Sequence, residues 1–264
     1  MQLSPVEFES VSPVRKKNHE PTTVWFSVSQ WGAWAPGLRT PEAWYRWARS
    51  EATIDSEGEP PVVAMPAMLR RRAGRLGRMA LEAAYAATGD QEMMPTVFCS
   101  RHGEVRRTCE MLMALARNEA LSPTAFSLSV HNAIGGLFSI ASGSNVPFTA
   151  IAAGKASVAS GVIEACGLLA DGEPEVLLVV YDEPLPAIYQ PYRDEPEFAF
   201  AWSWRMVPAF GEAFSLSWDV RGDEAPPHPP AAPLALEVLR FFLSGTPEST
   251  MECGRQIWRW RRHA

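Results

Sequence analysis

Short uninterrupted apolar segments alternate with helical segments through the middle of the chain, and this alternation restricts the possible folds more than any other feature. The strand-like segments lie at 95–100, 148–153 and 176–181. The segments with helical spacing between and after them lie at 105–118, 127–141 and 156–169. Strands that are apolar along their whole length are typical of parallel sheets buried on both faces. The sequence therefore predicts an α/β fold, with a mainly parallel sheet covered by helices.

The flanking segments differ in composition from this central part and divide the chain further. Two additional strands are predicted at 198–207 and 213–220, as an extension of the sheet. A proline-rich stretch after them cannot form regular structure and is predicted to be a linker. The four predicted parts are a flexible arm at 1–22, the main domain at 23–222, the linker at 223–233 and a C-terminal helical tail at 234–264.

Two helices are predicted ahead of the central part. Thr40 followed by Pro41 has the pattern of a helix start, because Thr accepts hydrogen bonds at an N-cap and Pro suits the first helical position. The longer helix, at 68–88, has one apolar stripe and an arginine row on the opposite face. The row consists of Arg71, Arg75 and Arg78. It is either a solvated basic face or a docking surface for an acidic partner, and the sequence leaves both interpretations open.

Charge and composition exclude several classes of protein. The formal net charge is -6, which gives no general basic surface for nucleic acid. No apolar run approaches the roughly 18–20 residues of a membrane-spanning helix. The N-terminal residues lack the apolar core of a secretory signal, and the four cysteines have neither C-x-x-C spacing nor the density of a disulfide scaffold. We therefore expect a cytoplasmic protein.

Common catalytic signatures are missing from the sequence. It contains no G-x-S-x-G, H-E-x-x-H or P-loop motif, and no set of residues at metal-ligand spacing, so neither a metal nor a cofactor is expected. Cys166 lies about three turns into its predicted helix, beyond the reach of the helix dipole. Cys99 has His102 nearby, which leaves a cysteine-dependent acyltransferase or thioesterase as an alternative. That pair would need the strand to end between them, because residues an odd number apart point to opposite faces.

Residues 122–186 carry a more specific pattern. A Ser-Pro start leads into a helix with Asn and small residues, then a short strand, a turn onto a second small-residue helix, and an apolar strand. This order resembles the N-terminal half of the β-ketoacyl synthases of fatty acid and polyketide assembly. Residues 68–84 and 98–104 look especially like the short chain length factors of aryl polyene and related pigment clusters. The resemblance covers most of residues 23–220 and does not extend beyond about residue 235.

The resemblance implies a thiolase-like half fold, with extra C-terminal strands and a helix, but not the family's chemistry. Active synthases place a nucleophilic cysteine where the short strand turns onto the helix, and the helix N-terminus favours its thiolate. The corresponding position here is Gly154, and Gly154-Lys155-Ala156 contains no thiol. The family's two catalytic histidines belong to a second half of the fold that this sequence does not provide. The chain is therefore expected to be inactive in condensation by itself.

From this resemblance we expect a non-catalytic chain length factor. It would form a heterodimer with an active β-ketoacyl synthase, help to shape the cavity for the growing acyl chain, and receive substrates from an acyl carrier protein. The candidate interface or cavity residues are Phe148, Thr149, Ile151, Leu137, Phe138, Met111 and Met113. For each of them, a place in the ordinary hydrophobic core is the alternative interpretation. The candidate carrier-docking residues are Arg71, Arg75 and Arg78. A stand-alone acyl-carrier or lipid-binding module is the second alternative.

Overall fold

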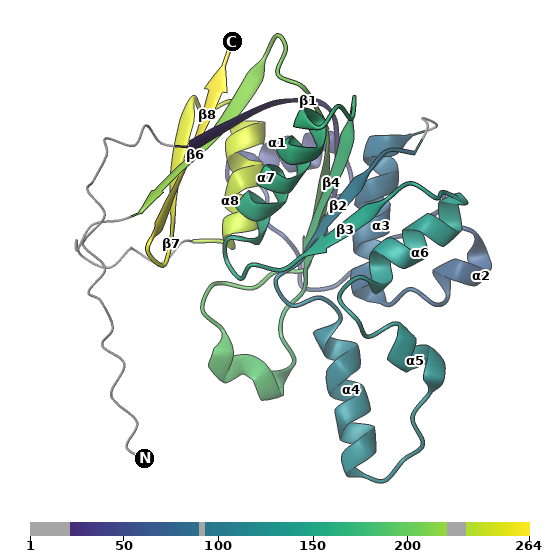
Figure 1. The fold of residues 1–264 in the computed structure, drawn as a ribbon. Helices are drawn as coiled ribbons and strands as arrows, with labels where there is room; N and C mark the ends of the chain where they lie inside the picture. The colour runs from purple at the N-terminus through teal and green to yellow at the C-terminus, as the bar shows by residue number, and fades with distance from the viewer. Residues whose placement is uncertain (1–21, 90–92, 221–230) are drawn as a thin grey trace, which may run out of the picture.

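An eight-stranded sheet organises the chain in the computed structural model, which describes residues 22–89, 93–220 and 231–264 (Figure 1). The strands follow the order β3-β2-β4-β5-β1-β6-β8-β7 across the sheet. Their bounds are β1 Thr22–Trp34, β2 Thr96–Cys99, β3 Phe148–Ile151, β4 Val176–Asp182, β5 Phe200–Val207, β6 Ala213–Val220, β7 Glu248–Cys253 and β8 Gln256–His263. The five strands predicted between residues 95 and 220 are all present.

The sheet is mixed rather than mainly parallel. Strand β2 runs parallel to both β3 and β4, as the continuous apolar segments predict. The other five pairings, which join β4, β5, β1, β6, β8 and β7 in turn, are antiparallel. The α/β class is confirmed, but the expectation of a mainly parallel sheet is wrong. Antiparallel neighbours need no helical crossover, so this half of the sheet lacks the alternation by which the sequence reveals the parallel half.

Helices cover both faces of the sheet. On one face lie α7 (Ser157–Ala170), α8 (Leu234–Ser244) and α1 (Pro41–Ala48), and on the other lie α3 (Arg75–Thr88) and α6 (Ala133–Ser142), as Figure 1 shows. The remaining helices are α2 (Ala67–Arg70), α4 (Val105–Ala116), α5 (Pro123–Ser127) and the 3-10 helix η1 (Ala187–Tyr192). None of the helices in the described residues has the length and apolar character that a membrane crossing requires.

Local signals at the helix starts explain several of these boundaries. The Thr40 hydroxyl accepts a hydrogen bond from the Ala43 amide at 3.3 Å, which confirms the predicted start of α1. The predicted helix at 68–88 is instead interrupted: α2 ends at Arg70 and α3 begins at Arg75. Gly74 has an extended backbone (ψ 176°) at the N-cap of α3, and this breaks the continuous arginine row that a single helix would present.

The C-terminal segment differs from the prediction of a helical tail. After α8, strands β7 and β8 form an antiparallel hairpin that pairs with β6. Trp258 and Trp260 of β8 are buried in the core, while Arg259 and Arg261 alternate with them on the other side. Buried and more exposed side chains therefore alternate along residues 256–263, as in a strand, and the expectation of a helix there is wrong. The predicted arm, apart from Thr22, and residues 223–230 of the predicted linker lie outside the described residues.

Candidate functional site

The turn between β3 and α7 has the strand–turn–helix geometry expected around Gly154, and we call residues 152–156 the elbow. Gly154 has a φ of +56°, a left-handed conformation that favours glycine, and a Cβ there would meet no atom within 4 Å. The Ser157 hydroxyl accepts a hydrogen bond from the Ala153 amide (3.0 Å) and donates one to the Gly154 carbonyl (2.6 Å). The turn is therefore well defined and exposed at residues 152–154, and it carries no thiol.

Cys99 and Cys166, the two cysteines weighed as nucleophiles from the sequence, are buried. Burial raises the pKa of the Cys99 thiol, with smaller contributions from the negative charges of Asp182 and Glu164. A Cβ on Gly161 of α7 would lie 2.2 Å from the Cys99 Sγ, so this thiol packs against the helix. Burial also raises the pKa of Cys166 to about 12. Both cysteines are thus held as protonated core residues rather than as the thiolates that nucleophilic catalysis requires.

His102 lies in a different environment from Cys99. It lines a cavity of about 10 Å³ beside Arg101, Asp182 and Glu195, a space that holds no more than about one water. Burial lowers the pKa of His102, and the positive charge of Arg101 lowers it further. This arrangement gives no support to a Cys99–His102 catalytic pair.

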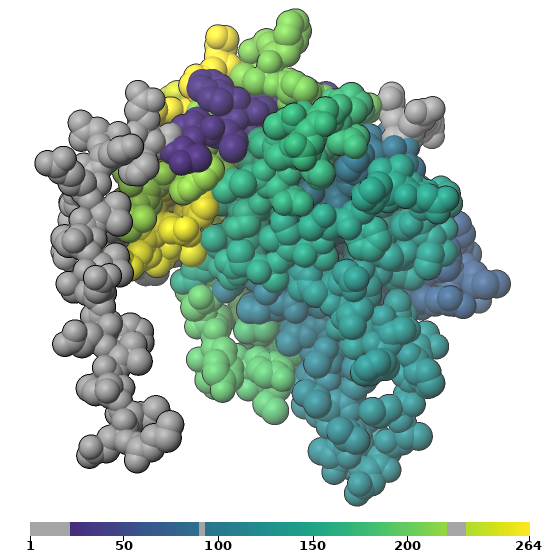
Figure 2. Space-filling view, in the orientation of Figure 1, coloured from purple at the N-terminus to yellow at the C-terminus, as the bar shows by residue number. Residues whose placement is uncertain are grey.

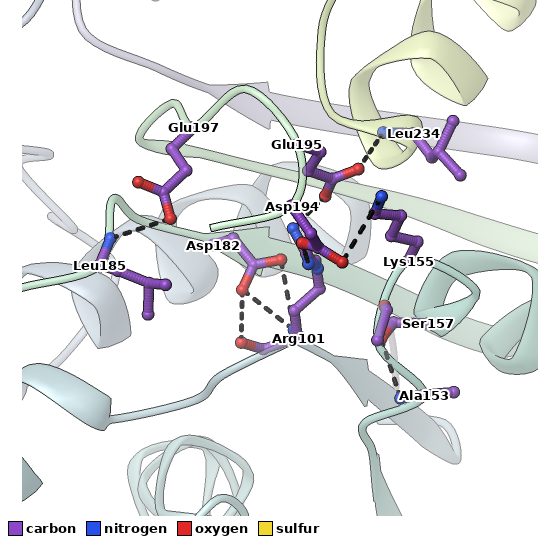
Figure 3. Close-up of polar contacts among 12 residues, drawn as sticks. Arg101, Ala153, Lys155, Ser157, Asp182, Leu185, Asp194, Glu195, Glu197 and Leu234 are labelled. Atoms are coloured by element: carbon purple, nitrogen blue, oxygen red, sulfur yellow. Dashed lines mark hydrogen bonds and ion pairs between the residues drawn. The ribbon is translucent and has the colours of Figure 1, made fainter. Parts of the chain in front are cut away.

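A polar cluster centred on Arg101 lies next to the elbow (Figure 3). The Arg101 guanidinium binds the carboxylates of Asp194 and Glu195, and the Lys155 Nζ lies 3.5 Å from the Asp194 Oδ2. Asp182, at the end of β4, accepts hydrogen bonds from the Ser100 hydroxyl at 2.8 Å and from the Arg101 amide at 3.0 Å. The cluster joins the ends of β2 and β4 to the elbow and to the segment that precedes β5.

The net pKa shifts of these acids differ in direction, although burial raises the pKa of each. Burial raises the pKa of Asp182 to about 7, although the Ser100 hydrogen bond and the Arg101 charge oppose this shift. Burial likewise raises the pKa of Glu195 against the opposing charge of Arg101. Burial alone would raise the pKa of Asp194. The hydrogen bonds and charges of Arg101 and Lys155 outweigh this effect, so the pKa is lowered. The cluster can hold charges and a proton, but it offers no nucleophile for condensation.

A second feature is an apolar groove of about 350 Å³ beside β3. It is lined by residues of α5, α6, the connection between them and β3, together with Arg72. The predicted cavity residues Phe148 and Leu137 both line it. Phe138 does not, because its ring packs in the core against Phe98 and Tyr85. The groove therefore brings together two of the residues that the sequence singled out.

The other predicted interface residues lie outside this groove lining. Thr149 and Ile151 are half-buried on β3, which forms one edge of the sheet. Met111 and Met113 lie on α4, which projects with α5 from the body of the molecule, as Figures 1 and 2 show. We call residues 105–127 the α4–α5 projection. Its exposed apolar side chains are Leu112, Met113, Leu115, Leu121 and Phe126.

The predicted arginine row does not present one free surface. Arg75 donates a hydrogen bond to the Gly58 carbonyl at 3.2 Å, and Arg78 donates to the Ala73 carbonyl at 3.1 Å. Arg78 also forms an ion pair with Glu59 at 3.3 Å. These two arginines therefore hold the loop that precedes α2, while Arg71 is exposed.

Sequence reasoning missed the Arg101 cluster. One signal was available, since Arg101 and Asp182 lie at the carboxyl ends of two predicted strands, and such ends meet at one edge of a parallel sheet. The Asp194 and Glu195 partners lie more than ninety residues from Arg101 in the chain and follow no recognisable motif.

Comparison with known proteins adds a family and several related structures. The sequence matches the family described as β-ketoacyl synthase, N-terminal domain, over residues 44–261. The similarity thus extends past residue 235, where the sequence alone indicated its end. No curated protein matches the sequence significantly.

Among solved structures, a chain of the ketosynthase ApeO in complex with its chain length factor ApeC from Xenorhabdus doucetiae is similar. It has a TM-score of 0.79 and 27% identity over 90% of this chain and 99% of that chain. The ishigamide ketosynthase/chain length factor has a TM-score of 0.60 and 15% identity over 77% and 68% of the two chains. A β-ketoacyl synthase from Burkholderia phymatum has a TM-score of 0.57 and 12% identity over 78% and 66%. The last two similarities concern the fold.

Proposed function

Because this chain belongs to the β-ketoacyl synthase family, whose N-terminal domain it matches, we propose that it is a non-catalytic chain length factor for an active ketosynthase. The observation that carries this proposal is the elbow. It has a strand–turn–helix geometry, with Gly154 in a left-handed conformation, yet residues 152–156 contain no thiol. Cys99 and Cys166 cannot substitute, because both are buried and their pKa values are raised. The partner would supply the cysteine and histidines of carbon–carbon bond formation.

The similarity to one solved complex supports this role. At 27% identity, this chain covers 99% of the matched chain in the complex of the ketosynthase ApeO with its chain length factor ApeC. A chain that works together with a ketosynthase is consistent with that similarity.

The free edge of β3 supports the proposed mode of association. β3 lies at the end of the strand order, and each of its residues is half-buried. The Pro147 and Ile151 carbonyls accept hydrogen bonds from β2, at 3.3 and 3.2 Å. Because successive residues of a strand point to opposite sides, the backbone groups of Phe148 and Ala150 face the free edge. An edge of this kind is a ready site for pairing with a second chain.

The groove supports the second part of the proposal, a contribution to the acyl-chain cavity. It lies directly beside β3 and is mostly apolar, with Phe148 and Leu137 among its walls. An acyl chain would bury its methylene groups there, each stabilised by about 0.8 kcal/mol. The same partner would cover the exposed apolar side chains of the α4–α5 projection, since a large exposed apolar surface is uncommon on a protein that works alone.

Carrier-protein recruitment belongs to the same proposal, with a reduced set of residues. Arg71 is exposed and available to an acidic carrier protein, whereas Arg75 and Arg78 are engaged with the loop before α2. Reversing the charge at Arg71 should slow carrier-dependent turnover by the complex most strongly at low salt, where electrostatic attraction is least screened. Full turnover by Arg71→Glu at every salt concentration would remove this residue from the proposal.

Blocking the β3 edge tests the association directly. Ala150→Pro removes an amide on the free edge and leaves the bonds to β2 intact, so the isolated chain should still fold. We expect it to lose co-purification with its ketosynthase partner. Ala150→Val keeps the amide and a good strand former, and should still co-purify. Co-purification of the proline variant at the wild-type level would contradict pairing through β3.

A further inference from the structure

Arg101 is an almost fully buried charge on which distant parts of the chain converge. Its side chain is 10% exposed, and its guanidinium binds Asp194 and Glu195 (Figure 3). The backbone at the same point joins two strand ends. The Ser100 amide donates to the Ile151 carbonyl of β3 at 3.2 Å, and the Arg101 amide donates to Asp182 of β4. Ser100 and Arg101 together therefore join the carboxyl ends of three neighbouring strands to the 183–199 segment.

Two branches leave Arg101 through its two carboxylate partners. The Asp194 branch reaches the elbow, since the second carboxylate oxygen of Asp194 lies 3.5 Å from Lys155. The Glu195 branch reaches α8, since the second carboxylate oxygen of Glu195 accepts a hydrogen bond from the Leu234 amide at 3.2 Å. One branch thus ends beside the exposed residues 152–154, and the other ends in the core of the protein.

Such an arrangement is unexpected beside a turn that carries no thiol. Burying a charged group is unfavourable unless it is paired, and a buried ion pair is weak evidence for stability. Its best-supported use is to fix one conformation among several. What Arg101 fixes through Asp194 is the elbow, and the elbow continues directly from the free edge of β3.

We propose that Arg101, acting through Asp194 and Lys155, is a positioning residue that holds the elbow in the shape that contacts the ketosynthase. The elbow is then part of the docking surface rather than a remnant of an active site. This inference rests on the proposed function for its partner, but the positioning itself is a property of the isolated chain. Glu195, on the other branch, would serve only to anchor α8.

The two branches can be cut separately. Asp194→Asn weakens the link to Lys155 and keeps a side chain of the same size, and Glu195→Gln does the same for the link to Leu234. Hydrogen exchange in the isolated full-length chain would be followed at two places. At the elbow, the reporters are the hydrogen-bonded amides of Ala153, Ala156 and Ser157, and in α8 they are those of Leu236 and Glu237.

We expect Asp194→Asn to speed exchange at the elbow by about two- to fivefold, with α8 unchanged, and to weaken ketosynthase binding by a similar factor, because the Asp194–Lys155 pair is half-exposed. Glu195→Gln should speed exchange in α8 and leave the elbow unchanged, and Asp194→Glu should restore wild-type exchange at the elbow. Unchanged elbow exchange in Asp194→Asn would overturn the positioning role, whether or not any ketosynthase binds. If Asp194→Asn speeds exchange at the elbow but binds the ketosynthase with wild-type affinity, the elbow is not part of the contact surface. Failure of the wild-type chain to bind would instead refute the proposed function.

Discussion

Gly135 of α6 lies so close to Phe148 of β3 that a Cβ on residue 135 would be 2.4 Å from the Phe148 Cδ2. The neighbouring Gly136 has open space on the same helix, with nothing within 4 Å of an added Cβ. The two adjacent glycines therefore have different reasons to be there. One permits the close approach of helix and ring, and the other leaves the groove open.

Alanine at these two positions should have opposite effects on stability. Gly135→Ala must displace the Phe148 ring, and such overpacking costs about 1–3 kcal/mol, against a gain of about 1 kcal/mol in helix propensity. Gly136→Ala gains the same helix propensity without any overpacking, so its free energy of unfolding should rise by about 0.5–1 kcal/mol. Urea unfolding of both variants gives the comparison. Equal stabilisation by both would show that the ring does not pack against residue 135 as described.

A large side chain at Gly136 should shorten the product without disturbing the fold. Phenylalanine there would project into the groove of about 350 Å³ beside Phe148 and occupy space that we assign to the acyl chain. The complex of Gly136→Phe with its ketosynthase should release shorter chains than wild type, as mass spectrometry of carrier-bound products would reveal. An unchanged product length would place the acyl chain elsewhere.

Cys99 should resist alkylation in the native protein. Its thiol is buried against α7 and its pKa is raised, so little thiolate forms at neutral pH. Cys253 is half-exposed and should react before it when native protein is treated with iodoacetamide and mapped by peptide mass spectrometry. Rapid modification of Cys99 at pH 7 would revive the cysteine-dependent transferase that the structure does not support.

The stability of the chain should fall as pH rises towards neutrality, through Asp182. Its pKa is raised from 3.8 to about 7 in the folded protein. Between those values the folded state binds more protons at this group than the unfolded state, so unfolding becomes easier with increasing pH. Asp182→Asn cannot titrate and should lose this part of the slope, which amounts to about 2–4 kcal/mol across the window. Parallel pH profiles for Asp182→Asn and wild type, from denaturant unfolding, would contradict a raised pKa.

The local sequence predicted those helices and strands whose own hydrophobic pattern is sufficient to identify them. The continuous apolar segments located β2, β3 and β4, and small-residue helical spacing located α7 to within one residue at each end. The turn at Gly154 followed from these two elements and from the resemblance to the synthases. In such segments the same residues determine both the element and its burial.

Other parts depend on contacts that no local pattern reveals. The hairpin of β7 and β8 looked like a tail because its arginines and tryptophans suit either a helix or a strand, and pairing with β6 decides between them. The break at Gly74 and the engagement of Arg75 and Arg78 depend on the loop that packs there. Glu195 binds the Arg101 guanidinium and accepts a hydrogen bond from the Leu234 amide, and the fold alone brings these three residues together. Residues far apart in sequence carry no shared local pattern.

The most direct test measures condensation of a malonyl carrier protein by the purified chain alone and by its complex with the ketosynthase partner. The chain has no thiol at residues 152–156, and Cys99 is buried, so it should incorporate no radiolabelled malonate into product by itself. The complex should do so, and the activity should vanish when the ketosynthase's own nucleophilic cysteine is replaced. Condensation by the isolated chain, at a rate comparable to that of the complex, would contradict the central claim.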